Sequence, residues 1–455
     1  MQLPESYNRM MEKLLEDYPA YRDSLSRPSE RGLRLNTLKI KTPKERERVL
    51  SILFGGAAPE RIPWSPDGYY VPADAAISEH PYYQAGLYYL QEPSAQAPAA
   101  ELPVRPGDRV LDLCAAPGGK STQLLAKLEG EGVLVANDLS AGRAAALRKN
   151  LELFGAKNAF VTVEEPERLA ASFAGYFDAI LVDAPCSGSG MFRRDPMMAA
   201  FYESNGPKTY VPEQARILEA AVSMLRPGGS LLYSTCTFAP EEDEEQVLAL
   251  LRRHPELSPK PLTSTAGFGA GPELLPKDSR LPEPAFCARL YPHRVRGDGQ
   301  FLALLQKNGE PGELKTVRSG KTRLHEAGNC IYLLPERSGP LPPLRYLMTG
   351  LCLAHNKKGR LQPTQALSMA LRGGEWPKTL ELPAEDERIV RYLKGESVFL
   401  KPGDVILEGN APGWLPDGID RRSLLVTVDG YPLGFAKDQN GLLKNLRDPG
   451  WRIAR

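Results

Sequence analysis

Two cysteines of the sequence follow short apolar runs that have the composition of buried strands. Cys186 comes after the run 178–183 through an Ala-Pro dipeptide, and Cys236 comes directly after the run 230–235. A single cysteine is usually a small buried hydrophobic residue. Two of them at strand ends instead predict one shared site, because ligands of open α/β sheets bind beyond the carboxyl ends of the strands.

A thiolate at such a site could act as a nucleophile towards a pyrimidine. Carbon 5 of cytosine becomes nucleophilic only after a thiolate adds to carbon 6, and this covalent route divides one difficult step into two easier ones. A free thiol, with a pKa of about 8.5, is only a few per cent ionised at pH 7, so a nearby cation or base would assist. Asp183 could hydrogen-bond the ring N3 and amino group. The second cysteine could assist release of the product, and the target base would have to be unstacked.

A glycine-containing turn follows a third apolar run. Glycines at a strand-to-helix turn let a ligand approach the backbone closely, and Asp138, after the run 133–137, could accept both hydroxyls of a ribose. The turn matches neither GxGxxG nor GxxxxGK[ST], so it favours a nucleoside-containing cofactor over a dinucleotide or a triphosphate. A tight turn without a ligand, which needs glycine only for its backbone conformation, would have the same sequence. The segment after the run 109–113 consists of Cys114, Ala115, Ala116, Pro117, Gly118, Gly119 and Lys120.

These residues require a parallel sheet to position them. Apolar runs alternate with helical patterns from about residue 108 onward, which is typical of βαβ units. A helix is expected over 141–154, with Ser140 as its N-cap and Gly155 beyond its end. The helix after Pro240 begins with acidic residues, 241–245, which would suit the positive end of its dipole. Strands are expected at 109–113, 133–137, 159–163, 178–183 and 230–235.

Composition limits the other possibilities. The 455 residues carry a formal net charge of +1, which excludes a uniformly basic nucleic-acid binder, so contacts to phosphates require local patches. One such patch lies between Glu336 and Glu375, where basic residues occur without acidic ones. The start of the chain has no signal-peptide pattern and no apolar run is long enough to span a membrane, which indicates a cytoplasmic protein without a membrane partner. The six cysteines form no CxxC pair, so neither a metal site nor a disulfide framework is expected.

The sequence resembles the Sun-type family of RNA cytosine-5 methyltransferases, and within it the bacterial enzymes that act on small-subunit ribosomal RNA. The resemblance covers nearly the whole chain, and the combination of Asp-Ala-Pro-Cys, ending at Cys186, with Ser-Thr-Cys-Thr around Cys236 is highly specific. It implies transfer of a methyl group from S-adenosyl-L-methionine to carbon 5 of a cytosine in RNA, with 16S ribosomal RNA, free or in the small subunit, as the expected substrate. The matching segments are 112–122, 138–143, 183–188 with 193–195, 225–238, and 290–293 with 297–301.

The resemblance also implies a role for each site residue. Cys236 would attack carbon 6, and Cys186 would assist release. DNA cytosine-5 enzymes attack with the Pro-Cys cysteine instead, so these two roles come from the resemblance and not from the spacing. An acidic residue beside the adenine is expected, and Glu165 is favoured over Glu164 although the usual Asp-Gly is absent. The expected catalytic residues are Cys236, Cys186, Asp183 and Lys120. The expected cofactor-binding residues are Cys114, Ala115, Ala116, Pro117, Gly118, Gly119, Lys120, Asp138, Arg143, Glu165 and Asp183.

The implied fold class is α/β. It comprises a Rossmann-like S-adenosylmethionine-dependent methyltransferase domain, a small N-terminal α+β domain and a C-terminal PUA-like β domain that binds RNA. The expected domains span residues 1–95, 96–307, 308–380 and 381–455, of which the third is basic. We expect a monomer that holds no metal.

Other interpretations stay open at this point. The target could be DNA or an exocyclic amine, although enzymes of the latter kind carry a second proline and an aromatic residue in place of Cys186. A tRNA cytosine-5 methyltransferase would share the same motifs. An RNA-binding ribosome-assembly factor of this fold, without activity, would not need Lys120, Asp183, Cys186 and Cys236, and all four are intact.

Overall fold

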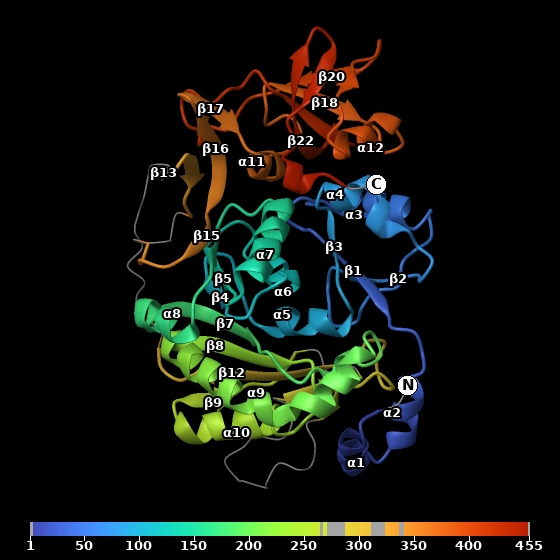
Figure 1. Cartoon of the computed structure of the whole chain (residues 1–455), viewed down its shortest axis with the longest axis vertical. Coiled ribbons are helices and arrows are strands. Elements are labelled where there is room, and N and C mark those ends of the chain that lie inside the picture. The colour runs from blue at the N-terminus through green and yellow to red at the C-terminus, as the bar shows by residue number, and fades with distance from the viewer. Residues whose placement is uncertain (1–2, 264–266, 271–286, 311–323, 336–340, 454–455) are drawn as a thin grey trace.

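The central sheet has ten strands in the computed structural model, which describes residues 3–263, 267–270, 287–310, 324–335 and 341–453 (Figure 1). Five of the strands run parallel, in the order β6-β5-β4-β7-β8. They confirm the expected strands, of which four agree to within one residue at each end, whereas β8 begins at Leu225 and not at residue 230. Their bounds are β4 Arg109–Asp112, β5 Val133–Asn137, β6 Ala159–Thr162, β7 Phe177–Asp183 and β8 Leu225–Thr235.

The order of the parallel strands reverses at β4. The next strand of the sequence, β5, pairs with one edge of β4, whereas β7 pairs with its other edge. Such a switch point leaves a crevice between neighbouring strand ends, and ligands of doubly wound sheets bind there. The loops that leave β4 and β7 carry the glycine-containing turn and Cys186. The topology therefore brings the expected cofactor segment and the expected catalytic residues to one edge of the sheet.

Antiparallel strands extend this sheet at both edges. β12 (Gln300–Lys307) pairs with β8 and continues through β11 (Cys287–Leu290) to β10 (Gly269–Ala270), and β9 (Leu257–Pro259) also pairs with β12. At the far edge β15 (Tyr346–Thr349) pairs with β6. The sequence did not predict β15 as part of this sheet, because nothing in its composition says which sheet edge it covers.

Helices cover both faces of the sheet and enclose two buried cores (Figure 1). The helix α7 has the bounds and both ends that the sequence predicts, because the Ser140 side chain accepts from Arg143 N and Gly155 adopts a left-handed conformation. The helix α9 bends at Gly206, which has a φ of 50°. On one face lie α5 (Ala97–Glu101), α6 (Gly119–Lys127) and α7 (Ala141–Phe154). On the other face lie α8 (Pro166–Phe173), α9 (Met197–Met224) and α10 (Glu244–Arg253).

The N-terminal domain contains a small antiparallel sheet in the order β2-β1-β3. Its helix α3 begins with a capping box, in which the Thr42 and Glu45 side chains each accept from the other residue's backbone N–H. Such a cap stabilises a helix end by about 0.5–2 kcal/mol. The elements are α1 (Glu5–Leu14), α2 (Tyr18–Ser24), β1 (Arg31–Leu35), α3 (Pro43–Leu53), β2 (Gly68–Val71), α4 (Pro81–Gln84) and β3 (Tyr88–Leu90).

Two further sheets follow the central one in the sequence. The first has the order β13-β14-β16-β17, and the second has the order β19-β23-β22-β21-β18-β20. The C-terminal sheet shares a buried core with the N-terminal domain, and the two lie side by side in Figure 1. The first sheet and its helix comprise β13 (Leu324–Ala327), β14 (Cys330–Leu333), β16 (Leu351–Lys357), β17 (Arg360–Pro363) and α11 (Gln365–Ala370). The second comprises β18 (Lys378–Leu382), α12 (Glu387–Leu393), β19 (Val398–Phe399), β20 (Val405–Glu408), β21 (Leu424–Val428), β22 (Tyr431–Gln439) and β23 (Leu442–Asn445).

None of the helices in the described residues combines the length and the apolar composition that crossing a membrane requires.

One buried arginine connects the N-terminal domain to the glycine-containing turn. Arg34, on β1, is 2% exposed and donates to Gly119 O at 2.9 Å and to Thr122 Oγ1 at 2.6 Å. Burial lowers the pKa of Arg34 to about 10. The charge is accommodated because both acceptors lie at the start of α6, beside the turn. Arg34 therefore positions the turn from the opposite domain.

We predict that Arg34→Ala lowers the free energy of unfolding by about 1–3 kcal/mol, because it leaves buried acceptors without their donor. Chemical denaturation followed by tryptophan fluorescence measures this change. Arg27→Ala is the control, since Arg27 is exposed and its pair with Asp23 is exposed too, and it should change stability by no more than about 0.5 kcal/mol. Equal effects of the two substitutions would contradict the proposed connection.

Candidate active site

The two expected catalytic cysteines lie in contact. β7 and β8 are parallel neighbours, with Asp183 opposite Ser234, so the loops after them emerge side by side. The Sγ atoms of Cys186 and Cys236 are 3.4 Å apart, and both side chains are half-buried. The hydrogen bond between the two sulfur atoms, together with burial, raises the pKa of Cys186 well above its usual value. Cys186 therefore keeps its proton at neutral pH.

A third cysteine lies nearby and is also held as a thiol. Cys114 begins the glycine-containing turn after β4. Burial, together with the charges of Asp112 and Asp183, raises the pKa of Cys114 well above its usual value. A thiol of this kind is a poor nucleophile, because the reactive form of cysteine is the thiolate.

Asp183 is held at both carboxylate oxygens. Lys120 Nζ lies 2.7 Å from Oδ2, and Gln300 Nε2 donates to Oδ1 at 3.1 Å. Burial alone would lower the pKa of Lys120, but the charge and hydrogen bond of Asp183 outweigh burial and raise it, and Cys236 contributes in the same direction. Lys120 is therefore a cation that is held by the Asp183 carboxylate and interacts with Cys236. Gln300 was not among the expected site residues, although it ends the Gly-Asp-Gly-Gln segment of the resemblance.

The glycine-containing turn is shaped by contacts to its backbone. Gly118 has a φ of 111°, a conformation that favours glycine. Asp138 accepts from Ala116 N at 3.3 Å and from Ser140 N at 3.0 Å, and Arg143 donates to Ala116 O at 2.9 Å. The structure thus brings Asp138 and Arg143 to the turn, as expected.

Asp112 is a further acidic residue at this turn, and it was not among the expected site residues. Its Oδ2 accepts from Ser121 Oγ at 2.6 Å, whereas Oδ1 is buried and has no hydrogen-bond partner within the described part of the chain. Burial raises the pKa of Asp112 to about 7. Asp112 lines the cavity beside the turn, so its free oxygen can accept a hydrogen bond from a bound molecule. The unpaired oxygen and the turn fit a ligand with donor groups, such as an amino-acid-bearing nucleoside.

This cavity has a volume of about 540 Å³ and lies between the N-terminal domain and the turn. One wall is the expected cofactor segment with Lys120 and Asp183. The other wall comes from β1, β3 and their flanking residues, which the sequence did not assign to the site. Two sequence-distant domains meet here, and no local pattern indicates that they do. The N-terminal lining residues are Ser29, Glu30, Arg31, Gly32, Tyr89, Leu90, Gln91, Glu92 and Ala95.

A buried carboxylate supports the loop that carries Cys186. Glu242 accepts from Ser187 N at 2.9 Å, from Gln214 Nε2 at 3.1 Å and from Ser187 Oγ. Gly190 N donates to Cys236 O at 2.8 Å, so the two cysteine loops are also joined directly. The sequence predicts that the helix after Pro240 begins with the acidic residues 241–245, but α10 begins at Glu244, so Glu242 lies before the helix. Glu242 precedes the helix and turns inward, because Ser187 supplies two buried donors there.

The other expected residues lie outside this cavity wall. Glu165, at the start of α8, is exposed and pairs with Arg216 at 3.1 Å. Glu164 is 1% exposed and accepts from Arg345 N at 2.6 Å, just before β15. The contact between Glu165 and adenine stays a prediction. His293, which follows β11, lies 3.0 Å from Asp17 of the N-terminal domain.

Comparison with known proteins assigns each part of the chain to one family. The family described as 16S rRNA methyltransferase RsmB/F matches residues 99–306, and the N-terminal domain of 16S rRNA methyltransferase RsmF matches residues 3–93. The first C-terminal domain of RsmF rRNA methyltransferase matches residues 301–371, and the RsmF PUA domain matches residues 379–453.

Individual relatives agree with this assignment. Ribosomal RNA small subunit methyltransferase F of Cronobacter sakazakii is 30% identical over 97% of this chain and 95% of its own length. A methyltransferase homolog protein from Pyrococcus horikoshii, known from its crystal structure, is 31% identical, covers 65% of this chain and 92% of its own, and has a TM-score of 0.55. NSun6 from Pyrococcus horikoshii, solved with SFG, shares the fold with a TM-score of 0.56 at 22% identity, over 68% of this chain and 99% of its own.

We predict that Glu242→Ala lowers the free energy of unfolding by about 2–4 kcal/mol, because the buried donors of Ser187 and Gln214 lose their acceptor. Glu241→Ala is the matched control, since Glu241 is exposed and adjacent, and it should change stability by less than about 0.5 kcal/mol. Denaturant titration of both variants measures the difference. Equal stability of the two variants would show that Glu242 does not support the loop.

The raised pKa of Asp112 predicts a pH-dependent stability. Between its ordinary value of 3.8 and its folded value of about 7, the folded chain holds a proton that the unfolded chain releases. The free energy of unfolding should therefore fall as pH rises through this window, by up to about 1.4 kcal/mol per pH unit for this group. Asp112→Asn removes the group, so the difference between the wild type and this variant should decline from about pH 5 to pH 7. Parallel pH profiles would contradict the prediction.

Proposed function

The chain belongs to the RsmF family of 16S rRNA methyltransferases, and from this premise we propose that Cys236 carries the reaction through a covalent bond to cytosine. The chain is an S-adenosylmethionine-dependent rRNA methyltransferase that modifies carbon 5 of cytosine. The observation that carries the covalent mechanism is the 3.4 Å contact of Cys236 with Cys186, beside Lys120 and Asp183.

Charge and hydrogen bonding separate the roles of the cysteines. Cys186 and Cys114 both keep their protons at neutral pH, as burial and their neighbours dictate. Cys236 differs from both, since the Cys186 thiol can donate to its sulfur and the Lys120 cation interacts with it. A hydrogen-bond donor and a cation stabilise a sulfur that carries negative charge during addition and release. These contacts agree with Cys236 as the nucleophile, the role that the resemblance implies.

The first step is addition of the Cys236 thiolate to carbon 6 of the cytosine. A bond forms between Sγ and carbon 6, the electron pair of the carbon 5–carbon 6 double bond moves into the ring towards N3, and N3 takes up a proton from solvent. Asp183, oriented by Lys120 and Gln300, would accept hydrogen bonds from the protonated N3 and from the amino group. Because both oxygens of Asp183 are already fixed before the base binds, less free energy is needed to orient the base in the transition state.

The cofactor segment and its neighbours would hold S-adenosyl-L-methionine. The turn Cys114–Lys120 would contact the methionine part, with Asp138 at the ribose and Asp112 accepting from a donor group of the cofactor. Arg143 would act through the turn, because it binds Ala116 O. When bound, S-adenosyl-L-methionine supplies an electrophilic methyl group at carbon 5. Relatives support this cofactor, since the NSun6 structure contains SFG, an analogue of it.

Release reverses the addition. Carbon 5 loses its proton to solvent, the electron pair restores the double bond to carbon 6, the bond from carbon 6 to Cys236 Sγ breaks, and N3 returns its proton to solvent. Negative charge then returns to that sulfur, 3.4 Å from the Cys186 thiol. A hydrogen bond from Cys186 stabilises the departing thiolate and so assists release.

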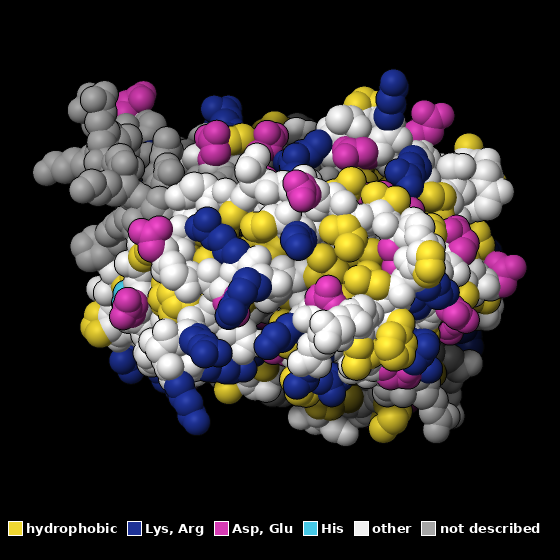
Figure 2. All heavy atoms as spheres, turned by 90° about the horizontal axis from the view of Figure 1, so that it is seen from above, with side chains coloured by type: hydrophobic (Ala, Val, Ile, Leu, Met, Phe, Trp, Pro, Cys, Tyr) yellow, Lys and Arg dark blue, Asp and Glu magenta, His cyan; other side chains and the backbone are white. Residues whose placement is uncertain are grey.

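The C-terminal half supplies surfaces for RNA. The chain has a PUA domain there. Figure 2 looks onto this end of the molecule and shows a group of Lys and Arg side chains beside a hydrophobic area. The turn between β16 and β17 carries Lys357, Lys358 and Arg360, all exposed, whereas Arg345 instead pairs with Glu164. Arg337, in the same basic segment, lies outside the described residues. Exposed cations at a hairpin tip suit the phosphate backbone of RNA.

We also propose the organisation in which the enzyme works. The division at residues 1–95, 96–307, 308–380 and 381–455 stays a proposal, because β15 joins the central sheet and β18 (Lys378–Leu382) of the C-terminal sheet crosses the boundary at residue 380. The expectation of a monomer stays a prediction. A cytoplasmic location is supported by the small-subunit ribosomal RNA that the relative from Cronobacter sakazakii is named for. An inactive assembly factor would need neither the cysteine contact nor the Lys120–Asp183 pair.

We predict that Cys186→Ala accumulates a covalent complex with small-subunit ribosomal RNA, because addition proceeds and release is impaired. A shifted band on a denaturing protein gel, removed by ribonuclease, measures it. Cys236→Ala should lower turnover at least about 1,000-fold, and the double variant should form no complex. Cys287→Ala controls for loss of a thiol elsewhere and should retain turnover. A covalent complex in the double variant would overturn the assignment of Cys236.

A further inference from the structure

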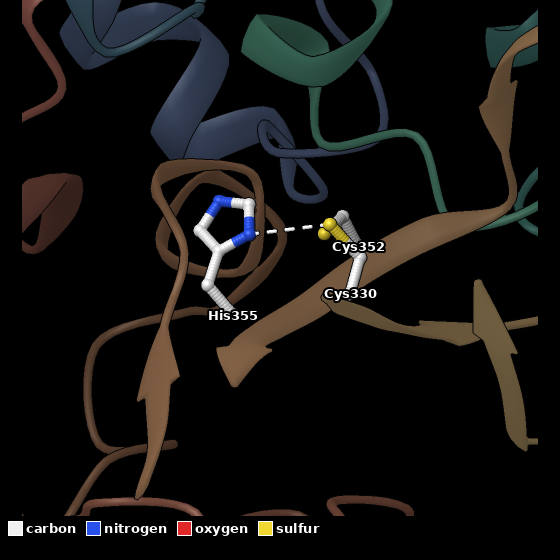
Figure 3. A group of neighbouring side chains, drawn as sticks. All are labelled: Cys330, Cys352 and His355. Atoms are coloured by element: carbon white, nitrogen blue, oxygen red, sulfur yellow. Dashed lines mark hydrogen bonds between the residues drawn. The ribbon is translucent and has the colours of Figure 1, made fainter. Parts of the chain in front are cut away.

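A second group of cysteines lies outside the active-site cavity. Cys330 is on β14, and Cys352 and His355 are on β16. One ligand atom from each side chain lies within 4.8 Å of the others, and Cys330 Sγ is 3.2 Å from His355 Nδ1. Figure 3 shows the imidazole ring facing the two neighbouring sulfur atoms. All three side chains are half-buried, so the group is accessible from solvent.

A β-bulge brings the three side chains to one face. Cys352 and His355 are three residues apart on the same strand, and in a regular strand such residues point to opposite faces. Tyr332 pairs with Cys352 and Ile331 pairs with Ala354, so Leu353 is an extra residue on β16. The extra residue reverses the alternation, and His355 and Cys352 then share a face with Cys330. Bulges commonly re-aim side chains in this way beside functional sites.

Two thiolates and an imidazole are a donor set that suits one class of metal. We propose that Cys330, Cys352 and His355 bind a zinc ion. Zinc prefers sulfur and nitrogen ligands in tetrahedral geometry, and hard cations such as Mg²⁺ prefer oxygen. Two thiolates and a neutral imidazole balance the charge of Zn²⁺. The proposal replaces the expectation of no metal, which rested on the missing CxxC spacing.

A fourth ligand can come from the cavity next to the cluster. This cavity has a volume of about 220 Å³ and is lined by all three proposed ligands. Arg148 and Glu152 of α7 face it as well, as do Asp448 and Trp451 near the end of the chain. Water in this cavity would complete a tetrahedron around the ion.

The position of the cluster indicates what the ion does. It lies where the four-stranded sheet, α7 of the methyltransferase domain and the C-terminal segment meet. The bulge interrupts the β14–β16 ladder at this point, so the sheet is held by fewer regular hydrogen bonds. A zinc ion would join β14 to β16 across the bulge and fix the sheet that carries the basic hairpin. Its role is structural, because the active-site cavity is lined by other residues.

Metal analysis of the purified full-length chain tests this proposal. Protein prepared in reducing buffer without chelator should contain about one zinc ion per chain by plasma mass spectrometry. Cys330→Ser, Cys352→Ser and His355→Gln should each lose most of it. His325→Gln, on the neighbouring β13, and the Cys186→Ala/Cys236→Ala double variant are matched controls that should keep it. Zinc below about a tenth of an ion per wild-type chain after incubation with zinc chloride would overturn the proposal, as would zinc retained by a Cys330→Ser/Cys352→Ser double variant.

A second readout uses the unaltered chain and does not depend on the folding of variants. Alkylation followed by peptide mass spectrometry should find Cys330 and Cys352 protected, and addition of a chelator should expose them at least several-fold. Cobalt(II) in place of zinc should give the absorption bands of a tetrahedral thiolate site. Equal alkylation with and without chelator, or a disulfide between Cys330 and Cys352 in reducing buffer, would contradict metal binding.

Discussion

The parallel pairing of β7 with β8 sets the geometry on which the site depends. With Asp183 opposite Ser234, the loops after the two strands leave the sheet together, and two cysteines far apart in the sequence come within 3.4 Å. A shift of the register would move the two sulfur atoms apart and turn Asp183 away from Lys120. The surrounding polar network, with Glu242 beneath Ser187 and Gln300 beside Ser234, keeps this register in place.

The cofactor side of the site depends on a contact between two domains. The switch point at β4 supplies the turn, and the N-terminal domain supplies the opposite wall of the cavity. Arg34 crosses between them and binds the backbone at the start of α6. Because the Arg34 guanidinium is buried, loss of its hydrogen bonds would not be compensated by hydrogen bonds to water and would lower the free energy of unfolding. The N-terminal domain is thus part of the architecture of the candidate site.

Local sequence patterns predicted the features that depend on residues close together in the chain. The ends of α7 follow from Ser140 and Gly155, and the parallel strands follow from apolar runs between helices. The expected positions of Asp138, Lys120 and the two cysteines follow from the rule that loops after parallel strands share one edge. Contacts between distant segments were not predictable in this way. Arg34, Gln300 and the inward turn of Glu242 each depend on a partner elsewhere in the chain, and so does the bulge that gathers Cys330, Cys352 and His355.

The central claim is that Cys236, and not Cys186, forms the bond to the base. RNA in which the target cytosine carries fluorine at carbon 5 tests it directly, because the fluorine cannot leave as a cation and the covalent complex is trapped after methyl transfer. Protease and nuclease digestion followed by mass spectrometry then identifies the modified peptide. The account predicts a methylated, fluorinated nucleotide on the peptide that contains Cys236. The same nucleotide on the peptide that contains Cys186 would contradict it.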